Sequence, residues 1–172
     1  MIYLKTDEEV ELMRRSNDLL GRTLAEVAKV IRPGVTTAEL DKVAYEFICD
    51  NGGIPSCLGY EGYPATLCTS VNEQVVHGIP SDKVVLKDGD IVSVDTVVKL
   101  NGFCADSAYT FPVGEVAPEV LQLMRTTKEA LYLGIEQAVT GRRLGDIGAV
   151  IQQHCERAGY SVVREFVGHG IG

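Results

Sequence analysis

Apolar residues recur at helical spacing in two segments near the start of the chain. The first segment begins at Thr6 and Glu9, which form a capping box. In this box each side chain accepts a hydrogen bond from a backbone N–H that has no partner within the first turn of the helix. A proline-glycine pair ends this segment, and a second box of Thr36 and Glu39 opens the next. The pattern predicts one helix of about six turns and a shorter one that ends near Gly52.

The same plan recurs in the second half of the chain. Leu-Met-Arg occurs at 12–14 and again at 123–125, each time at the opening of a long helical pattern. This self-similarity predicts a duplicated unit with copies at about 6–111 and 117–172. Because β-branched runs with Gly, Pro and Asn lie between the helices, we predict an α+β fold. Two helix pairs would lie against a mainly antiparallel sheet, and the whole chain would form a single domain.

A hairpin is predicted between 91–100 and 103–111, because Asn101-Gly102 between them is the strongest short hairpin signal. A two-residue loop fixes the register and places Asp95 and Asp106 on one face, about 7–8 Å apart at the backbone. The other face is predicted to be a core surface. It carries Val92, Val94, Val98, Leu100, Phe103, Ala105, Tyr109 and Phe111.

Two carboxylates this close repel each other unless a positive charge lies between them, so a metal site is one interpretation of the aspartate pair. Two metal ions about 3.5–4 Å apart can share bridging carboxylates and lower the pKa of a water until it attacks a carbonyl. The alternative is a solvent-exposed edge whose aspartates only keep the sheet soluble.

The three histidines differ in their surroundings. His77 and His169 each follow an apolar run and precede a glycine, an arrangement that predicts a strand end delivering its imidazole to a site. His154 lies inside a helix predicted over 144–158, where a structural role near the helix end is expected. Imidazole beside carboxylates suits manganese, iron, cobalt or zinc, so the residues favour a metal-assisted hydrolase among several classes of metal enzyme.

The composition narrows the class of protein. The 172 residues are 45% hydrophobic and 23% charged, enough to bury a core, and their net charge of -8 would repel a nucleic acid. No signal peptide and no apolar run of about 18 residues is visible, so we expect a cytoplasmic protein that does not enter a membrane. The five cysteines contain no CxxC pair, which makes free thiols the expectation.

Ordered motifs along the whole chain resemble those of type I methionine aminopeptidases. They are Cys57-Leu-Gly-Tyr60-Glu-Gly-Tyr63-Pro64, Ser70-Val-Asn72-Glu-Gln-Val-Val-His77-Gly-Ile-Pro80, Lys87-Asp-Gly-Asp90-Ile-Val-Ser-Val-Asp95, Cys104-Ala-Asp106 and Gly168-His169-Gly-Ile-Gly172. The resemblance implies the pita-bread fold with an internal pseudo-two-fold. It also implies two divalent metal ions and removal of the initiator methionine from nascent polypeptides when the next residue is small.

The resemblance also implies roles for single residues. Asp95, Asp106 and His169 match metal ligands, with Asp106 bridging the ions. His77 matches an imidazole that contacts the substrate and can donate to its developing oxyanion. The backbone around Asn72 matches a site for a monovalent cation. Four further residues match the methionine pocket, where thiols and aromatic rings make soft contacts with a thioether. They are Cys57, Tyr60, Tyr63 and Cys68.

The chain departs from the family pattern at its end. It stops at Gly172, whereas the family continues with a further substrate-contacting histidine and two glutamate ligands. We therefore expect a truncated form whose second half is incomplete. Alone it would bind metal weakly or at one site, would be weakly active or inactive, and could self-associate through open sheet edges.

Three alternatives remain open. A pita-bread binding module without catalysis is possible because a fold does not imply a function. A thiol hydrolase would use Cys57 or Cys68 with His77, although nothing in the sequence around either cysteine activates it. A proline-cleaving relative would share the metal centre and differ in its pocket.

Overall fold

The computed structural model describes residues 3–171. They form two compact units, one reaching to Val116 and also including residues 170–171, the other comprising Ala117–His169. No helix within the described residues combines the length and apolar character needed to cross a membrane. The predicted duplication and the single-domain description stay predictions.

Two capped helices open the first unit: α1, Asp7–Val30, and α2, Thr37–Asp50. Thr6 Oγ1 accepts the N–H of Glu9 at 3.3 Å, and the Glu9 carboxylate accepts the N–H of Thr6 at 2.8 Å. Thr36 forms the same reciprocal pair at the start of α2. Both predicted capping boxes and both helix positions are confirmed.

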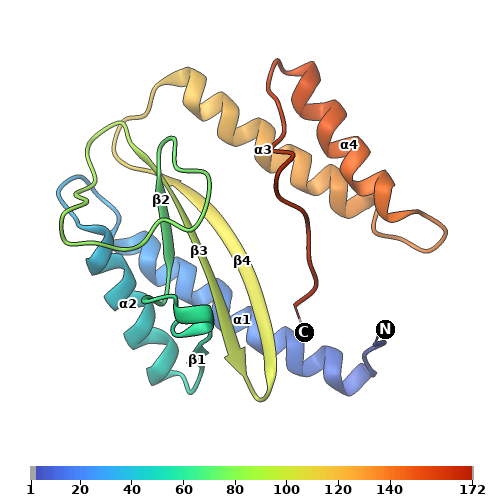
Figure 1. Cartoon of the computed structure of the whole chain (residues 1–172), viewed down its shortest axis with the longest axis horizontal. Helices are drawn as coiled ribbons and strands as arrows, with labels where there is room; N and C mark the ends of the chain where they lie inside the picture. The colour runs from blue at the N-terminus through green and yellow to red at the C-terminus, as the bar shows by residue number, and fades with distance from the viewer. Residues whose placement is uncertain (1–2, 172) are drawn as a thin grey trace. The chain divides into compact units, whose positions relative to one another are not determined.

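The strands form one antiparallel sheet in which β3 is central (Figure 1). The strand bounds are β1 Ile54–Pro55, β2 Cys68–Val71, β3 Ile91–Leu100 and β4 Phe103–Pro112. β4 pairs with the whole of β3, while β1 and β2 pair with separate stretches of β3 along its other edge. A short 3-10 helix, η1 Tyr60–Gly62, lies between β1 and β2.

The hairpin register is confirmed, with Leu100 opposite Phe103 and Ile91 opposite Pro112. Helix α1 packs on β3 and β4, and α2 packs on α1. The face predicted to be core is buried at four positions, Val92, Val94, Val98 and Ala105. Tyr109 corrects that prediction, because it is 47% exposed. It lies on the outer strand β4, where its ring contacts Phe111 at a centroid distance of 4.8 Å instead of reaching the buried centre.

A buried serine joins α1 to the hairpin. Ser16 Oγ lies 3.2 Å from the carbonyl oxygen of Leu100 and 3.0 Å from that of Phe103, the two residues that flank the hairpin turn. The hydroxyl also lies 3.2 Å from the carbonyl oxygen of Leu12, one helical turn earlier. Ser16 thus fixes where α1 crosses the end of the sheet.

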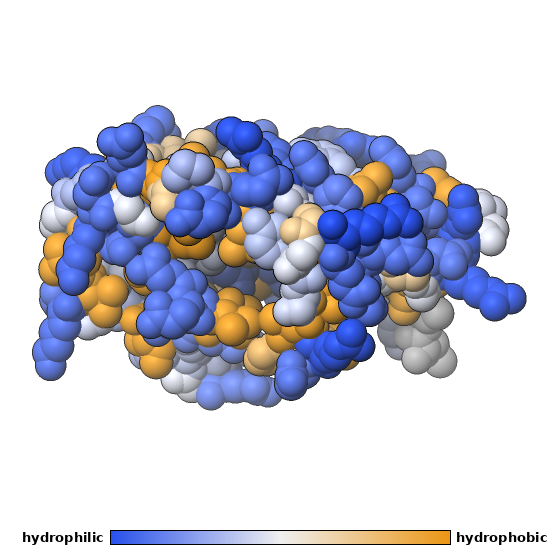
Figure 2. Space-filling model, turned by 90° about the horizontal axis from the view of Figure 1, so that it is seen from above, coloured by the Kyte–Doolittle hydropathy of each residue, from blue (hydrophilic) through white to orange (hydrophobic). Residues whose placement is uncertain are grey.

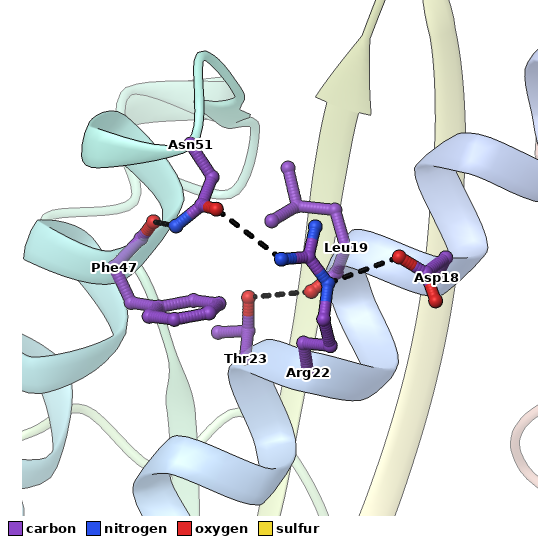
Figure 3. Close-up of polar contacts among 6 residues, drawn as sticks. All are labelled: Asp18, Leu19, Arg22, Thr23, Phe47 and Asn51. Atoms are coloured by element: carbon purple, nitrogen blue, oxygen red, sulfur yellow. Dashed lines mark hydrogen bonds and ion pairs between the residues drawn. The ribbon is translucent and has the colours of Figure 1, made fainter.

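A second polar group links α1 to the end of α2 on the solvent side (Figure 3). The Arg22 guanidinium bonds to Asp18 Oδ2 at 2.9 Å and to Asn51 Oδ1 at 3.3 Å, and its centre lies 5.9 Å from the Phe47 ring. Asn51 in turn donates to the carbonyl oxygen of Phe47 at 2.8 Å. These contacts hold the two helices together without burying a charge.

The second unit contains α3, Pro118–Glu136, and α4, Leu144–Arg157, close to the predicted bounds. A Cβ at Gly134 of α3 would lie 2.8 Å from Cδ1 of Ile151, so the helices approach closely there. His154 Nε2 lies 3.1 Å from the Glu129 carboxylate, so this imidazole contacts α3. Residues 160–171 form neither helix nor strand.

Large apolar side chains stay exposed in both units. Tyr60 is 69% exposed in the first unit and Leu144 is 87% exposed in the second. Figure 2 shows hydrophobic residues interspersed with hydrophilic ones on the face that it draws. Self-association, which was predicted through open sheet edges, stays a prediction.

Candidate functional site

The two aspartates lie on the sheet face opposite α1. Asp95 pairs with Ala108 and Asp106 with Val97, so the two carboxylates are diagonal neighbours on one face. Backbones in this arrangement are about 7–8 Å apart, within reach of two converging side chains. Both residues are only partly exposed, and Asp95 lies on the central strand. The predicted placement on one face is confirmed, and because Asp106 lies on the outer strand β4, the metal role of the pair stays a prediction.

Two thiols border the carboxylate pair. Cys68 on β2 is the direct cross-strand partner of Asp95, and Cys57 Sγ accepts the N–H of Val97 at 3.3 Å. Burial raises the pKa of both thiols, and the negative charges of Asp95 and Asp106 raise the two pKa values further. These thiols therefore stay protonated at neutral pH. That state disfavours the thiol-hydrolase alternative, which needs a thiolate nucleophile.

The two tyrosines of the predicted pocket have different surroundings. The Tyr63 hydroxyl donates toward the carbonyl oxygens of Leu67 at 3.0 Å and Gly78 at 3.2 Å. Burial raises the pKa of Tyr63, so its hydroxyl stays protonated and remains a donor. Tyr60 lies in η1 and is largely exposed. Tyr63 is thus hydrogen-bonded to the backbone next to Cys68, while Tyr60 lies at the surface.

His77 lies beside β2 because the next residue, Gly78, is hydrogen-bonded to that strand. The Gly78 carbonyl accepts the N–H of Thr69 at 2.7 Å, and the Gly78 N–H donates to Ser70 Oγ at 3.1 Å. A Cβ at Gly78 would overlap the Thr69 carbonyl, so only glycine allows this approach. His77 itself is exposed, with a φ of 59° in the left-handed region.

The strand ends predicted before His77 and His169 are absent from the described residues. Val75 and Val76 lie in the loop between β2 and β3 and are 58% and 43% exposed. In the described part of the chain, the apolar run before His169 likewise pairs with no strand. An apolar run becomes a strand only where a partner supplies ladder hydrogen bonds, and neither run has one there.

Asn72 has a structural role at the start of β3. Its side chain donates to the Asp90 carboxylate at 2.8 Å and accepts the N–H of Ile91 at 3.0 Å. The cation site predicted at its backbone stays a prediction.

Of the three predicted metal ligands, Asp95 and Asp106 lie side by side in the first unit, and His169 belongs to the second. Within residues 3–171, no group of three or more His, Cys, Asp or Glu side chains is arranged to hold a metal ion. The aspartate pair nevertheless fits a cation. It supplies two carboxylates on one face, and its negative field reaches both bordering thiols.

One contact near the pocket has no local sequence signal. Asp41 on α2 accepts the backbone N–H groups of Thr66 and Leu67, which precede β2. The contact joins residues 25 and 26 positions apart, beyond the reach of any helical or strand periodicity.

Comparison with known proteins defines the class. Residues 11–172 match metallopeptidase family M24, and the chain belongs to this family. Membership implies divalent metal cofactors. The chain is 51% identical over 172 residues to a methionine aminopeptidase of Clostridium acetobutylicum, covering all of this chain and 69% of that protein. It is 47% identical to methionine aminopeptidase 1 of Bacillus subtilis over the same share. The resemblance to methionine aminopeptidases is confirmed.

Solved structures agree. Methionine aminopeptidase from Rickettsia prowazekii superimposes with a TM-score of 0.98 at 42% identity, covering 100% of this chain and 69% of that one. The Xaa-Pro dipeptidase of Bacillus anthracis gives a TM-score of 0.77 at 22% identity, over 96% of this chain and 44% of that one, which shows a shared fold alone. The pita-bread fold is confirmed, and a binding module without catalysis is not favoured.

Proposed function

We propose that the chain acts as a methionine aminopeptidase that removes the initiator methionine from nascent polypeptides when the second residue is small. The observation that carries the proposal is the placement of Asp95 and Asp106 side by side, bordered by Cys57 and Cys68. The whole chain is also 51% identical to a methionine aminopeptidase. The proposed partner is therefore a polypeptide N-terminus that begins with Met.

Asp95 and Asp106 would be ligands of a divalent metal ion, and the resemblance to methionine aminopeptidases implies His169 as a further ligand. The donor set of carboxylate and imidazole suits manganese, iron, cobalt or zinc. When bound, such ions polarise a carbonyl oxygen and lower the pKa of water to near neutrality. The chain contributes the geometry, because the paired strands β3 and β4 hold the two carboxylates in a fixed register.

His77 would donate a hydrogen bond to the first carbonyl oxygen of the substrate, which gains negative charge as the carbon becomes tetrahedral. Its place beside β2 follows from the backbone bonds of Gly78. A donor aimed at this oxygen stabilises the transition state more than the ground state, which is the requirement for catalysis.

Four side chains would line the methionine pocket: Cys57, Cys68, Tyr60 and Tyr63. The raised pKa values of both thiols keep them neutral, so a thioether would meet polarizable sulfur and not a charge. A pocket of neutral thiols and rings selects an apolar, flexible side chain and offers no partner for a charged one.

The test is methionine release from Met-Ala-Ser with added manganese or cobalt, against a chelated control. Asp106→Asn should abolish release and weaken manganese binding measured by calorimetry. Asp82→Asn is the matched control, since Asp82 is an exposed carboxylate outside the sheet. Ala-Pro substrates should not be cleaved, and iodoacetamide at neutral pH should inhibit only slowly. An Asp106→Asn variant that binds manganese and turns over like the parent would refute the proposal.

A further inference from the structure

Asp41 holds a backbone segment from which the proposed pocket is built. It lies on α2, and its Oδ1 accepts the N–H of Thr66 at 2.9 Å and the N–H of Leu67 at 2.7 Å. Thr66 is 1% exposed and Leu67 is fully buried. Two buried amides therefore depend on one carboxylate oxygen from a separate element. Hydrogen bonds to an ionised acceptor are about twice as strong as neutral ones.

The same short segment is held from two further directions. Thr96 Oγ1 on β3 donates to the Thr66 carbonyl oxygen at 2.8 Å, and the Tyr63 hydroxyl donates toward the Leu67 carbonyl oxygen at 3.0 Å. Cys68 follows at once as the first residue of β2. Residues 63–68 thus begin and end with a proposed pocket residue, Tyr63 and Cys68. Side chains, and not hydrogen bonds between strands, hold Thr66 and Leu67 between them.

We propose that Asp41 is a positioning residue for the methionine pocket, setting where the Tyr63 ring and the Cys68 thiol lie relative to a bound side chain. The inference rests on the proposed function, because the pocket is that of a methionine aminopeptidase. Asp41 acts indirectly, through the hydrogen bonds that it accepts from the amides of Thr66 and Leu67. Without that acceptor two buried N–H groups lose their partner, and the segment must move toward water to satisfy them.

The half-buried state of the carboxylate agrees with this role. Burial raises the pKa of Asp41, and the two amide bonds offset part of that rise. Burial thus disfavours the ionised form of Asp41, and the hydrogen bonds from the amides of Thr66 and Leu67 offset part of this cost. An exposed carboxylate on the same helix, Glu46, pairs with Lys42 at 3.9 Å and serves as the comparison.

The test compares Asp41→Ala, Asp41→Asn and Asp41→Glu with Glu46→Ala as the matched control on the same helix. Asparagine keeps the accepting oxygen, whereas glutamate keeps the charge but pushes the segment outward by one methylene. The first readout is the iodoacetamide alkylation rate of each cysteine, resolved by mass spectrometry. It needs no catalytic activity, so it decides the proposal even if the chain releases no methionine.

In Asp41→Ala, Cys68 should be alkylated about tenfold faster, because losing a pair of hydrogen bonds lowers the cost of local opening. Cys155 on α4 in the second unit should be unchanged and serves as the internal reference. Asp41→Asn should fall between the parent and Asp41→Ala, because it keeps the accepting oxygen but loses the charge, and Glu46→Ala should match the parent. The second readout is methionine release, where KM should rise about tenfold in Asp41→Ala while kcat changes little.

Asp41→Glu keeps the proposal testable if the alanine variant does not fold. It can satisfy both amides, so a purely structural acceptor would leave KM and Cys68 reactivity at the parent values. A positioning residue requires both to rise. The proposal is overturned if the glutamate variant behaves like the parent, or if Cys68 and Cys155 accelerate together, since that would show general loosening. Failure of methionine release in the parent chain would count against the proposed function alone.

Discussion

The hydroxyl of Thr69 on β2 offers the sharpest test of the packing. Thr69 is 2% exposed, and Oγ1 has no hydrogen-bond partner among the residues that the structure describes. Thr96 on the neighbouring strand is fully buried, but its Oγ1 donates to the Thr66 carbonyl oxygen at 2.8 Å. Valine is nearly isosteric with threonine. The same substitution at the two positions therefore removes an orphaned hydroxyl in one case and a hydrogen bond in the other.

The two effects have opposite signs. A buried polar group without a partner costs about 1–3 kcal/mol, so Thr69→Val should stabilise the fold by roughly that amount. Thr96→Val should destabilise it by about 1–3 kcal/mol, because the Thr66 carbonyl is left without its donor. For a chain of this size each kcal/mol shifts the melting temperature by about 2–4 °C. The two variants should thus melt on opposite sides of the parent.

The assay is thermal and urea unfolding of the parent and both variants at one pH, followed by circular dichroism. Equal m-values would show that the unfolded states are comparable. If Thr69→Val loses as much stability as Thr96→Val, the Thr69 hydroxyl has a partner in solution. The assignment of an orphaned buried hydroxyl would then be wrong.

Three further perturbations follow from other contacts. Gly78→Ala should push the loop that carries His77 away from the Thr69 carbonyl, lowering kcat for methionine release by about 100-fold and also lowering the melting temperature, because the bonds from Gly78 to Thr69 and Ser70 are lost. Because burial raises the pKa of Asp41, the folded state takes up a proton there more readily than the unfolded state. The parent should therefore gain stability relative to Asp41→Asn as pH falls through that raised pKa, as measured by urea unfolding between neutral and acidic pH. Arg22→Ala should cost at most about 1 kcal/mol in urea unfolding, because the contacts of Arg22 are exposed to solvent.

Each of these has a clear contrary result. Parent-like kcat in Gly78→Ala would show that the loop tolerates the displacement. A stability difference between the parent and Asp41→Asn that does not change with pH would show that Asp41 titrates alike in the folded and unfolded states. A loss above about 2 kcal/mol in Arg22→Ala would mean that the charge is less solvated than its exposure indicates.

Local interactions made much of the first unit predictable from the sequence. The capping boxes at Thr6 and Thr36 join residues three positions apart, and the hairpin register follows from a two-residue turn. The placement of Asp95 and Asp106 on one face needed only that register. These features depend on short stretches of chain, in which the residue types themselves determine the local backbone geometry.

Contacts between distant segments could not be predicted in the same way. His77 was expected at a strand end because its apolar run looks like a strand, but pairing depends on a partner that sequence periodicity does not identify. Asp41 meets the amide of Thr66 across 25 positions, and no local pattern marks either residue. Tyr109 alternates correctly with its neighbours, yet it is 47% exposed on the outer strand, and alternation does not show how far burial extends along that strand.

The contact at Ser16 has a consequence for the order of folding. The hairpin that carries Asp95 and Asp106 is local, whereas Ser16 reaches its ends across 84 and 87 positions. Hairpins form in about 1–10 μs, while closing a long loop costs more chain entropy. We expect pulse-labelled hydrogen exchange to protect β3 before α1 docks. The two carboxylates would then reach their final register before the core is complete.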